Sequence, residues 1–240
     1  MISKMSRPPL LTLALISMLI GASINATRTN TPRLSILTDK PNYESLTPDF
    51  VSYNYTQTLD HFNYKPESNT TFQQRYIVNS KYWGGPITSS PIFVYMGAEV
   101  DITHQVLGVG FFPVLASRFH GLMVYIEHRY YGTSMPFGSE EEAYKDANSL
   151  GFFSSEQALA DYAQIILHLK QDLSAENCPV IVVGGSYGGM LASWFRLKYP
   201  HMAYGALAAS APILYFKGLT PENGYDHVVS NDFNVSKSNI

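Results

Sequence analysis

The chain has 240 residues, of which 45% are hydrophobic and 15% are charged, and its formal net charge is −3 at pH 7. This composition is too apolar for a disordered protein and provides enough hydrophobic residues for one substantial core. Because the charge balance is acidic and no basic stripe is visible, the sequence excludes a strong electrostatic footprint for nucleic acid.

Residues 1–26 have the features of a secretory signal peptide. A short basic start with Lys4 and Arg7 precedes an apolar stretch over residues 10–20, and small residues follow near a plausible cleavage point. A membrane anchor is the alternative, but a spanning helix needs about 20 apolar residues, and this stretch is shorter. We therefore predict cleavage, no membrane anchor afterwards, and passage through the secretory pathway to a lysosome, a vacuole or the extracellular space.

Residues 27–50 are polar, contain prolines and lack periodicity, which indicates a flexible or propeptide-like leader. Asn54 and Asn69, which follow it, lie in N-x-[S/T] sequons within a polar stretch and are the better candidates for glycosylation among the four sequons of the chain. Chance occurrence of these sequons is the alternative.

Alternating aromatic or β-branched and polar residues over 53–62 and 72–78 predict a hairpin of half-exposed antiparallel strands. The apolar runs 92–96 and 122–126 that follow predict fully buried parallel strands. Helical spacing over 110–119 separates these two runs.

A stronger helix is predicted after the second run. Ser154 and Gln157 fit a capping box, and apolar residues recur at three- and four-residue steps up to Leu173. Beyond it we expect a buried strand over 180–183, a helix over 190–199 that Pro200 ends, and another buried strand over 206–213. This alternation predicts an α/β fold with a parallel sheet and right-handed crossovers.

The side chains that commonly bind metals form no recognisable metal-binding pattern. Cys178 is the only cysteine, so the chain holds no internal disulfide, and a structural or partner-seeking thiol is the favoured interpretation. The seven histidines lack H-E-x-x-H or similar spacing. We predict no metal and no cofactor.

The segment from Gly184 to Gly189, Gly-Gly-Ser-Tyr-Gly-Gly, directly follows an apolar run and fits the nucleophile elbow G-x-S-x-G. In this pattern a strand turns sharply into a helix and exposes the serine, so Ser186 is the candidate nucleophile. The Tyr187 backbone N–H would then contribute half of an oxyanion hole. A plain tight turn is the alternative; a phosphate-binding loop is disfavoured because neither G-x-G-x-x-G nor Gly-Lys-[Ser/Thr] is present.

The chain resembles the family of lysosomal Pro-X carboxypeptidase and dipeptidyl peptidase II over roughly residues 50–235. The resemblance is carried by Thr-Leu-Asp-His-Phe at 58–62, Tyr-Met-Gly-Ala-Glu at 95–99, Glu-His-Arg-Tyr-Tyr-Gly at 127–132, Pro-Phe-Gly at 136–138 and the elbow itself. It implies an α/β-hydrolase fold and a serine exopeptidase that acts on peptides at proline or a small residue. It also implies a second oxyanion donor from the loop Gly97-Ala98-Glu99, with Glu99 as an alternative ligand for a substrate amine.

Two further groups of charged residues lie where a catalytic role can be considered. Glu127, His128 and Arg129 are predicted to be structural, because neighbours on a strand point to opposite faces and charged clusters at strand ends usually fix loops. In the implied fold an aspartate and a histidine follow the serine. Asp226 and His227 have that order but are adjacent, so their side chains diverge.

The sequence therefore offers no complete triad. We expect residues 51–240 to be the N-terminal part of an α/β-hydrolase domain, truncated before the helical cap and the last strands of the family fold. Two functions remain: a serine exopeptidase with Ser186 as nucleophile and its Asp and His partners missing from this chain, or a noncatalytic hydrolase-like binding or decoy module. The choice between carboxypeptidase and dipeptidyl peptidase, and the oligomeric state, stay open.

Overall fold

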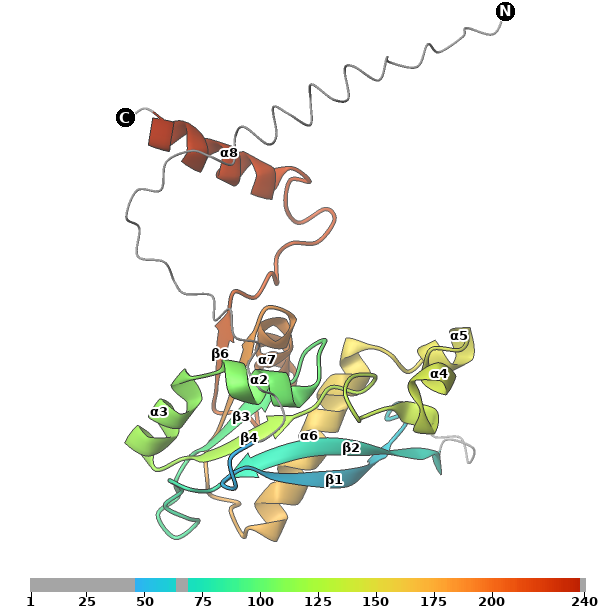
Figure 1. The fold of residues 1–240 in the computed structure, drawn as a ribbon, viewed down its shortest axis with the longest axis vertical. Coiled ribbons are helices and arrows are strands. Elements are labelled where there is room, and N and C mark those ends of the chain that lie inside the picture. Colours follow the sequence, from blue (N-terminus) through green and yellow to red (C-terminus); the bar gives the residue numbers. More distant parts are fainter. Residues whose placement is uncertain (1–45, 64–68, 238–240) are drawn as a thin grey trace, which may run out of the picture. The chain divides into compact units, whose positions relative to one another are not determined.

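A mixed sheet of six strands, in the order β1-β2-β4-β3-β5-β6, organises the part of the chain described by the computed structural model, which covers residues 46–63 and 69–237 (Figure 1). The predictions of a signal peptide over 1–26 and of most of the 27–50 leader lie outside the described residues.

The hairpin comprises β1 (Val51–Thr58) and β2 (Thr71–Asn79), which pair antiparallel as predicted. The first strand is shorter than the predicted 53–62, because the chain turns away after Thr58. The Asp60 carboxylate accepts the backbone N–H of Phe62, and the His61 ring bonds to Asp161 on a distant helix. These side-chain bonds replace strand pairing at this end of the hairpin.

The predicted parallel strands are confirmed. β3 (Ile92–Met96) lies between β4 (Leu122–Ile126) and β5 (Val180–Gly185) and is parallel to both. Every residue of β3 and β4 is buried. Continuous apolar runs are the expected sequence for strands that are covered on both faces.

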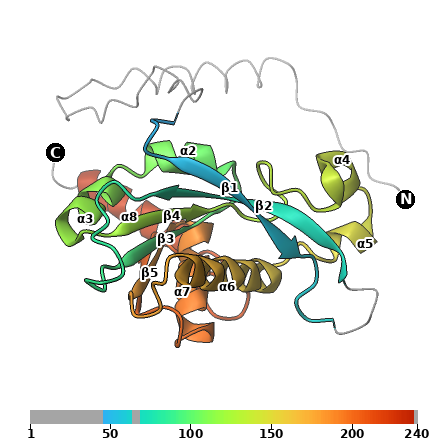
Figure 2. The same cartoon turned by 90° about the horizontal axis from the view of Figure 1, so that it is seen from below.

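Helices cover the two faces of the sheet. Figure 2 shows α6 (Ser155–Asp172) and α7 (Tyr187–Lys198) on one face, and α2 (Ile102–Gly108) and α3 (Phe111–Phe119) on the other. The alternation of side chains along each strand divides the core accordingly, since Val94 packs in the cluster of α6 and α7 and Tyr95 in that of α2 and α3.

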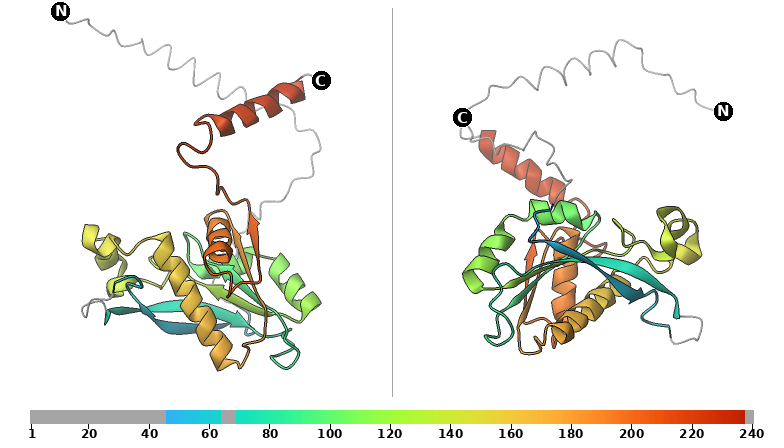
Figure 3. Two further views of the ribbon diagram at one scale, coloured as in Figure 1. Left: turned by 180° about the vertical axis from the view of Figure 1, so that it is seen from behind. Right: turned by 60° about the horizontal axis from the view of Figure 1, so that its bottom comes forward.

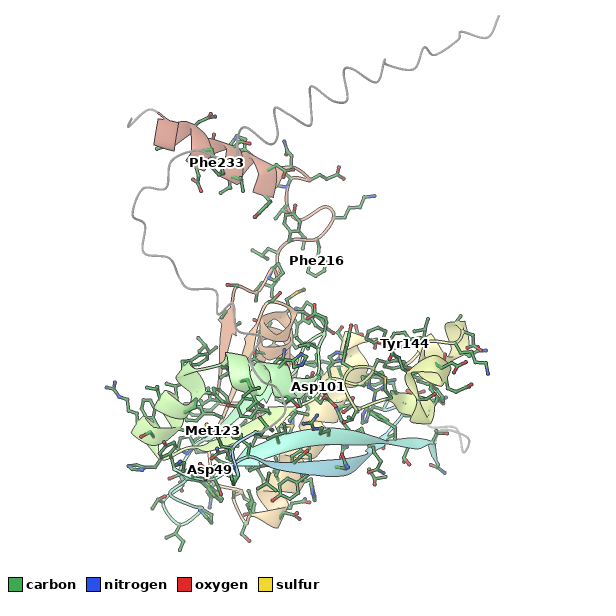
Figure 4. The ribbon with its side chains drawn as sticks, viewed as in Figure 1. Asp49, Asp101, Met123, Tyr144, Phe216 and Phe233 are labelled. Atoms are coloured by element: carbon green, nitrogen blue, oxygen red, sulfur yellow. The ribbon has the colours of Figure 1, made fainter. Side chains whose placement is uncertain are left out.

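Helix α2 is absent from the sequence-based expectations. Its start is fixed by Asp101, labelled in Figure 4, whose carboxylate accepts the N–H of Thr103 at 2.7 Å. Three further short elements join β4 to α6: η3 (Pro136–Gly138), α4 (Glu140–Ala143) and α5 (Ala147–Leu150).

Half of the capping box predicted for α6 is present. The Ser154 hydroxyl accepts the N–H of Gln157 at 3.3 Å, as predicted. The Gln157 side chain does not return to Ser154; it donates to Asp60 at 2.7 Å and accepts the N–H of His61 at 3.0 Å. This amide thereby joins the start of α6 to the segment that follows β1.

The strand predicted over 206–213 is shorter and less buried than expected. β6 (Gly205–Ala209) pairs with β5 alone among the described strands, and Ala206 to Ala209 are exposed because the strand forms an edge of the sheet. It ends where Ser210 adopts a φ of 49°. Figure 3 shows β6 beside β5, with α6 and α7 packed side by side. Farther along the chain, α8 (Gly224–Lys237) was not predicted.

Candidate active site

The strand-turn-helix geometry around Ser186 is the one that the elbow pattern predicts. β5 ends at Gly185 and α7 begins at Tyr187, and Ser186 between them has φ 55° and ψ −124°. A positive φ at a serine is a strained conformation that persists only when the surroundings impose it. The residue is exposed and its side chain makes no capping bond to α7. The hydroxyl is thus left accessible at the tip of the turn.

Glycines around the serine are required to different degrees. A Cβ on Gly184 would lie 2.0 Å from the carbonyl oxygen of Gly188, and a Cβ on Gly188 would lie 2.7 Å from that of Met96. By contrast, a Cβ on Gly185 would meet only the Tyr95 hydroxyl, at 3.8 Å. The first and last glycines of G-x-S-x-G therefore permit backbone contact between the strand, the helix and β3.

The positive end of α7 lies directly at this turn. Tyr187 is the first residue of the helix, so its N–H has no acceptor within the helix and is aligned with the helix dipole. A negative oxygen forming beside Ser186 would be stabilised by such a donor. The geometry agrees with the role expected for the Tyr187 N–H, which remains a prediction.

The loop expected to give the second oxyanion donor follows β3. The Gly97 N–H donates to the carbonyl of Ile126 at 2.9 Å, and the Ala98 N–H donates to the Gln105 side chain at 3.2 Å. Within the described chain, Glu99 is the residue of this loop whose N–H has no such bond. Its side chain is exposed and close enough to Tyr187 to contribute, after burial and Tyr131, to raising the pKa of that phenol.

Gly97 has a packing role that the sequence did not reveal. A Cβ at this position would lie 2.3 Å from the carbonyl oxygen of Ile126. Its own carbonyl accepts the hydroxyl of buried Tyr162 at 2.7 Å. Gly97 thus lets the end of β3 contact β4 closely, while α6 holds the loop from the other side.

Glu127 is buried and structural, as the sequence predicted. Its carboxylate accepts the backbone N–H groups of Ile102, Thr133 and Ser134 at 3.1, 2.9 and 2.9 Å. These bonds hold the loop after β4 against the start of α2. No part of this carboxylate is left for a substrate, because the side chain has no exposed surface.

Arg129 forms a buried ion pair with Asp161 of α6. Both guanidinium-to-carboxylate distances are 2.6 Å, and both side chains are inaccessible to solvent. The guanidinium also donates to the carbonyl of Leu59 at 2.8 Å, and the His61 ring lies 2.7 Å from the same carboxylate. This network confirms the structural role predicted for Arg129, and it gives the half-buried His61 ring a partner. The role of Asp161 was not predicted from the sequence, because an acidic residue within an amphipathic helix is ordinarily exposed.

His128 points in a different direction from Glu127, toward the elbow. Its Nε2 lies 3.0 Å from the Tyr187 hydroxyl and its Nδ1 lies 2.5 Å from the carbonyl oxygen of Arg129. Burial lowers the pKa of the imidazole to about 4, although the hydrogen bond to the Arg129 carbonyl and the charge of Asp161 act in the opposite direction. The sequence predicted a structural histidine but gave no signal for its partner.

No complete catalytic triad is present in residues 46–63 and 69–237. The Ser186 hydroxyl makes no hydrogen bond to any described histidine. Asp226 and His227 are exposed on α8, and the ring of His227 accepts a bond from Asn231 at 3.3 Å, one turn farther along. These findings agree with the sequence-based view that this adjacent pair does not serve Ser186.

The described residues also contain no group of three or more metal-binding side chains that could hold an ion. Cys178 is buried, and burial raises the pKa of its thiol, so its side chain is not an activated nucleophile. None of the helices in the described ranges has the length and apolar character needed to cross a membrane.

The family described as serine carboxypeptidase S28 matches residues 57–239. Lysosomal Pro-X carboxypeptidase from Homo sapiens is 44% identical over 204 residues, which cover 85% of this chain and 40% of that protein. The Mus musculus protein of the same name is 43% identical, over 89% of this chain and 44% of that protein. The human thymus-specific serine protease is 37% identical, over 72% of this chain and 32% of that protein. The chain thus spans less than half the length of these relatives.

Proposed function

Because the chain belongs to the serine carboxypeptidase S28 family, we propose that it is the nucleophile-bearing part of a serine exopeptidase. The observation that carries the proposal is the conformation of Ser186, which has φ 55° and ψ −124° between a buried strand and the N-terminus of α7. The residue is exposed, and its side chain makes no hydrogen bond to the first turn of the helix. Such an arrangement lets a hydroxyl reach a carbonyl carbon while backbone N–H groups face the oxygen.

In the proposed reaction, the Ser186 Oγ attacks the carbonyl carbon of the scissile peptide bond. A histidine held by an aspartate takes the hydroxyl proton and passes it to the leaving amine. The negative oxygen of the tetrahedral intermediate accepts bonds from the N–H of Tyr187 and, from the loop after β3, the N–H of Glu99. Water then attacks the acyl-enzyme and restores the hydroxyl. The histidine and aspartate would come from outside the described residues.

The proposed substrates are peptides with proline or a small residue at the cleavage point. The Pro-X in the names of the lysosomal relatives supports proline at this point. The carboxylate of Glu99, exposed beside the elbow, is the proposed ligand for a substrate amine. If Glu99 has that role, Glu99→Gln raises KM for a substrate with a free N-terminal amine and leaves KM for an N-acylated substrate unchanged.

The proposed route is the secretory pathway with delivery to the lysosome or a similar compartment. The signal peptide expected over 1–26 and the lysosomal relatives support it. Asn54 and Asn69 are both exposed and are the proposed glycosylation sites. Digestion with an N-glycosidase, followed by mass spectrometry of the peptides that contain these two residues, tests them directly.

A fluorophosphonate probe tests the catalytic proposal. We expect covalent labelling of the protein expressed at its native length, and loss of that labelling in Ser186→Ala. The 240-residue chain expressed by itself should not be labelled, because a serine hydroxyl without a base is weakly nucleophilic. Mass spectrometry of the C-terminus of the protein from its natural source establishes the native length.

The alternative function is that of a noncatalytic binding module, in which Ser186 has no catalytic role. If the native protein resists the probe and Ser186→Ala changes nothing, this second function replaces the first.

A further inference from the structure

His128 is a buried side chain that contacts Tyr187 of the elbow and has no task in the proposed reaction. It follows β4 and is fully buried. Four aromatic rings surround the imidazole at centroid distances of 5.4 to 6.3 Å: those of Tyr131, Phe153, Tyr162 and Tyr187. Only the last of these belongs to the elbow, and it is the one whose hydroxyl bonds to the imidazole.

Two hydrogen bonds fix the tautomer of this ring. The carbonyl oxygen of Arg129, 2.5 Å from Nδ1, can only accept, so Nδ1 carries the hydrogen. Burial keeps the ring neutral above about pH 4, so Nε2 has a free lone pair. The Tyr187 hydroxyl, 3.0 Å away, is therefore the donor, and burial keeps this phenol protonated by raising its pKa.

This bond acts on the residue whose N–H is the proposed oxyanion donor. The Tyr187 hydroxyl is hydrogen-bonded to His128, which follows β4. Gly188 packs so closely against the carbonyl of Met96, at the end of β3, that a Cβ would not fit between them. The start of α7 is thereby held against two strands. Because Ser186 occupies a strained conformation, such external contacts are needed to maintain the turn.

Support for the imidazole extends further into the core. The carbonyl that receives Nδ1–H belongs to Arg129, whose guanidinium is fixed by Asp161 of α6 at 2.6 Å. The ring orientation is thus set by a buried ion pair, and it does not depend on an exposed group that solvent could displace.

We infer that His128 is a positioning residue: as the neutral Nδ1–H tautomer it accepts a hydrogen bond from the Tyr187 hydroxyl and holds the elbow N–H toward the forming oxyanion. The inference rests on the proposed function. Loss of an oxyanion donor slows related reactions by about 10²- to 10³-fold, so partial displacement of a donor should cost roughly tenfold.

A double-mutant cycle on the native-length protein tests the coupling through the rate of fluorophosphonate labelling. We expect Tyr187→Phe and His128→Leu each to slow labelling by roughly tenfold, and the double variant to be no slower than the slower single variant. His128→Gln, which retains an acceptor, should recover most of the rate. Tyr53→Phe removes an exposed hydroxyl on β1 and is the matched control. Multiplied losses in the double variant, or an unchanged rate in Tyr187→Phe, would overturn the inference.

NMR of the ¹⁵N-histidine-labelled protein reads the bond independently of activity. We expect His128 to have a protonated Nδ1 and an unprotonated Nε2, and its Nε2 resonance to shift in Tyr187→Phe. A hydrogen on Nε2 in the unmodified protein would overturn the inference, even if Tyr187→Phe were slow. If labelling persists in Ser186→Ala, the proposed function fails and the positioning role falls with it, while the NMR result still reports whether the bond exists.

Discussion

At the scale of single residues, the elbow depends on backbone atoms that approach each other where side chains would not fit. Gly184 and Gly188 face each other across the turn, and neither position leaves space for a Cβ. Ser186 itself donates its backbone N–H to the carbonyl of Ala209 at 3.0 Å. The backbone of the turn therefore determines where the exposed hydroxyl lies, in addition to the rotamer of the side chain.

Two adjacent glycines provide a direct test of this close approach. We expect Gly184→Ala to lower the free energy of unfolding by about 3 kcal/mol, because its Cβ would meet a carbonyl oxygen at 2.0 Å. Gly185→Ala, whose nearest neighbour lies at 3.8 Å, should change it by less than about 0.5 kcal/mol. Urea unfolding measures both, and equal losses in the two variants would contradict the proposed backbone contact.

The neutral imidazole of His128 predicts a pH dependence of stability. Burial lowers its pKa from 6.5 to about 4 in the folded protein, so between these values the unfolded chain binds more protons. The free energy of unfolding should therefore fall as the pH drops from 6.5 to 4, by on the order of 3 kcal/mol in total from this residue. Urea unfolding at several pH values in this interval measures the free energy of unfolding. It should decrease less steeply with falling pH for His128→Gln than for the unmodified protein.

The exposed position His201 gives the control for the pH experiment, since His201→Gln removes a histidine at the surface. The prediction fails if both variants have the same slope, or if the unmodified protein gains stability on acidification through this interval.

At the scale of elements, a buried polar network joins β1, the segment after β4, and α6. Arg129 is its centre: it pairs with Asp161 and donates to the carbonyl of Leu59 beyond the end of β1. Gln57 of β1 adds a bond to the Asp161 carbonyl at 3.2 Å, and its amide also donates to Gln74 of β2 at 2.9 Å. The hairpin is thereby fixed to the parallel part of the sheet by more than strand pairing.

Breaking this network from one side should be strongly destabilising. Asp161→Asn leaves the Arg129 guanidinium buried without a counter-charge, and we expect it to lower the free energy of unfolding by about 3–5 kcal/mol. The exposed pair of Glu142 and Lys145 is the matched control, because Glu142→Gln should change the free energy of unfolding by less than about 1 kcal/mol. Chemical denaturation separates the two outcomes; a small effect of Asp161→Asn would show that water or another group compensates the arginine.

At the scale of the whole described sheet, the two edges differ. β1 forms one edge, and a second edge is formed by β6, whose residues Ala206 to Ala209 are exposed and uncharged. Phe216, labelled in Figure 4, follows on the same stretch of chain and is 45% exposed. An exposed strand edge without charges is a template for pairing with another chain.

We therefore expect the 240-residue chain expressed by itself to self-associate through β6. Leu207→Lys places a charge on this edge and should shift the sedimentation profile toward monomer. Leu167→Lys, at a residue of α6 with 44% exposure against 46% for Leu207, is the matched control and should leave the profile unchanged. Equal effects of the two lysines would assign the association to general surface hydrophobicity.

Features that depend on local pattern could be predicted from the amino-acid sequence. Period-two alternation placed the hairpin, continuous apolar runs placed β3 and β4, and G-x-S-x-G placed the turn at Ser186. Each of these signals lies within a few consecutive residues, where backbone sterics and side-chain periodicity act directly. The family, too, was recognisable from such short segments.

Contacts between side chains that are distant in the sequence became visible only in the folded structure. His128 and Tyr187 are 59 residues apart and Arg129 and Asp161 are 32 apart, and nothing in the local pattern joins either pair. The same holds for β6, an apolar segment that the sequence predicted as buried and the strand order places at an edge. Burial and hydrogen bonding between remote elements depend on how the sheet is assembled, and that arrangement is a property of the whole fold.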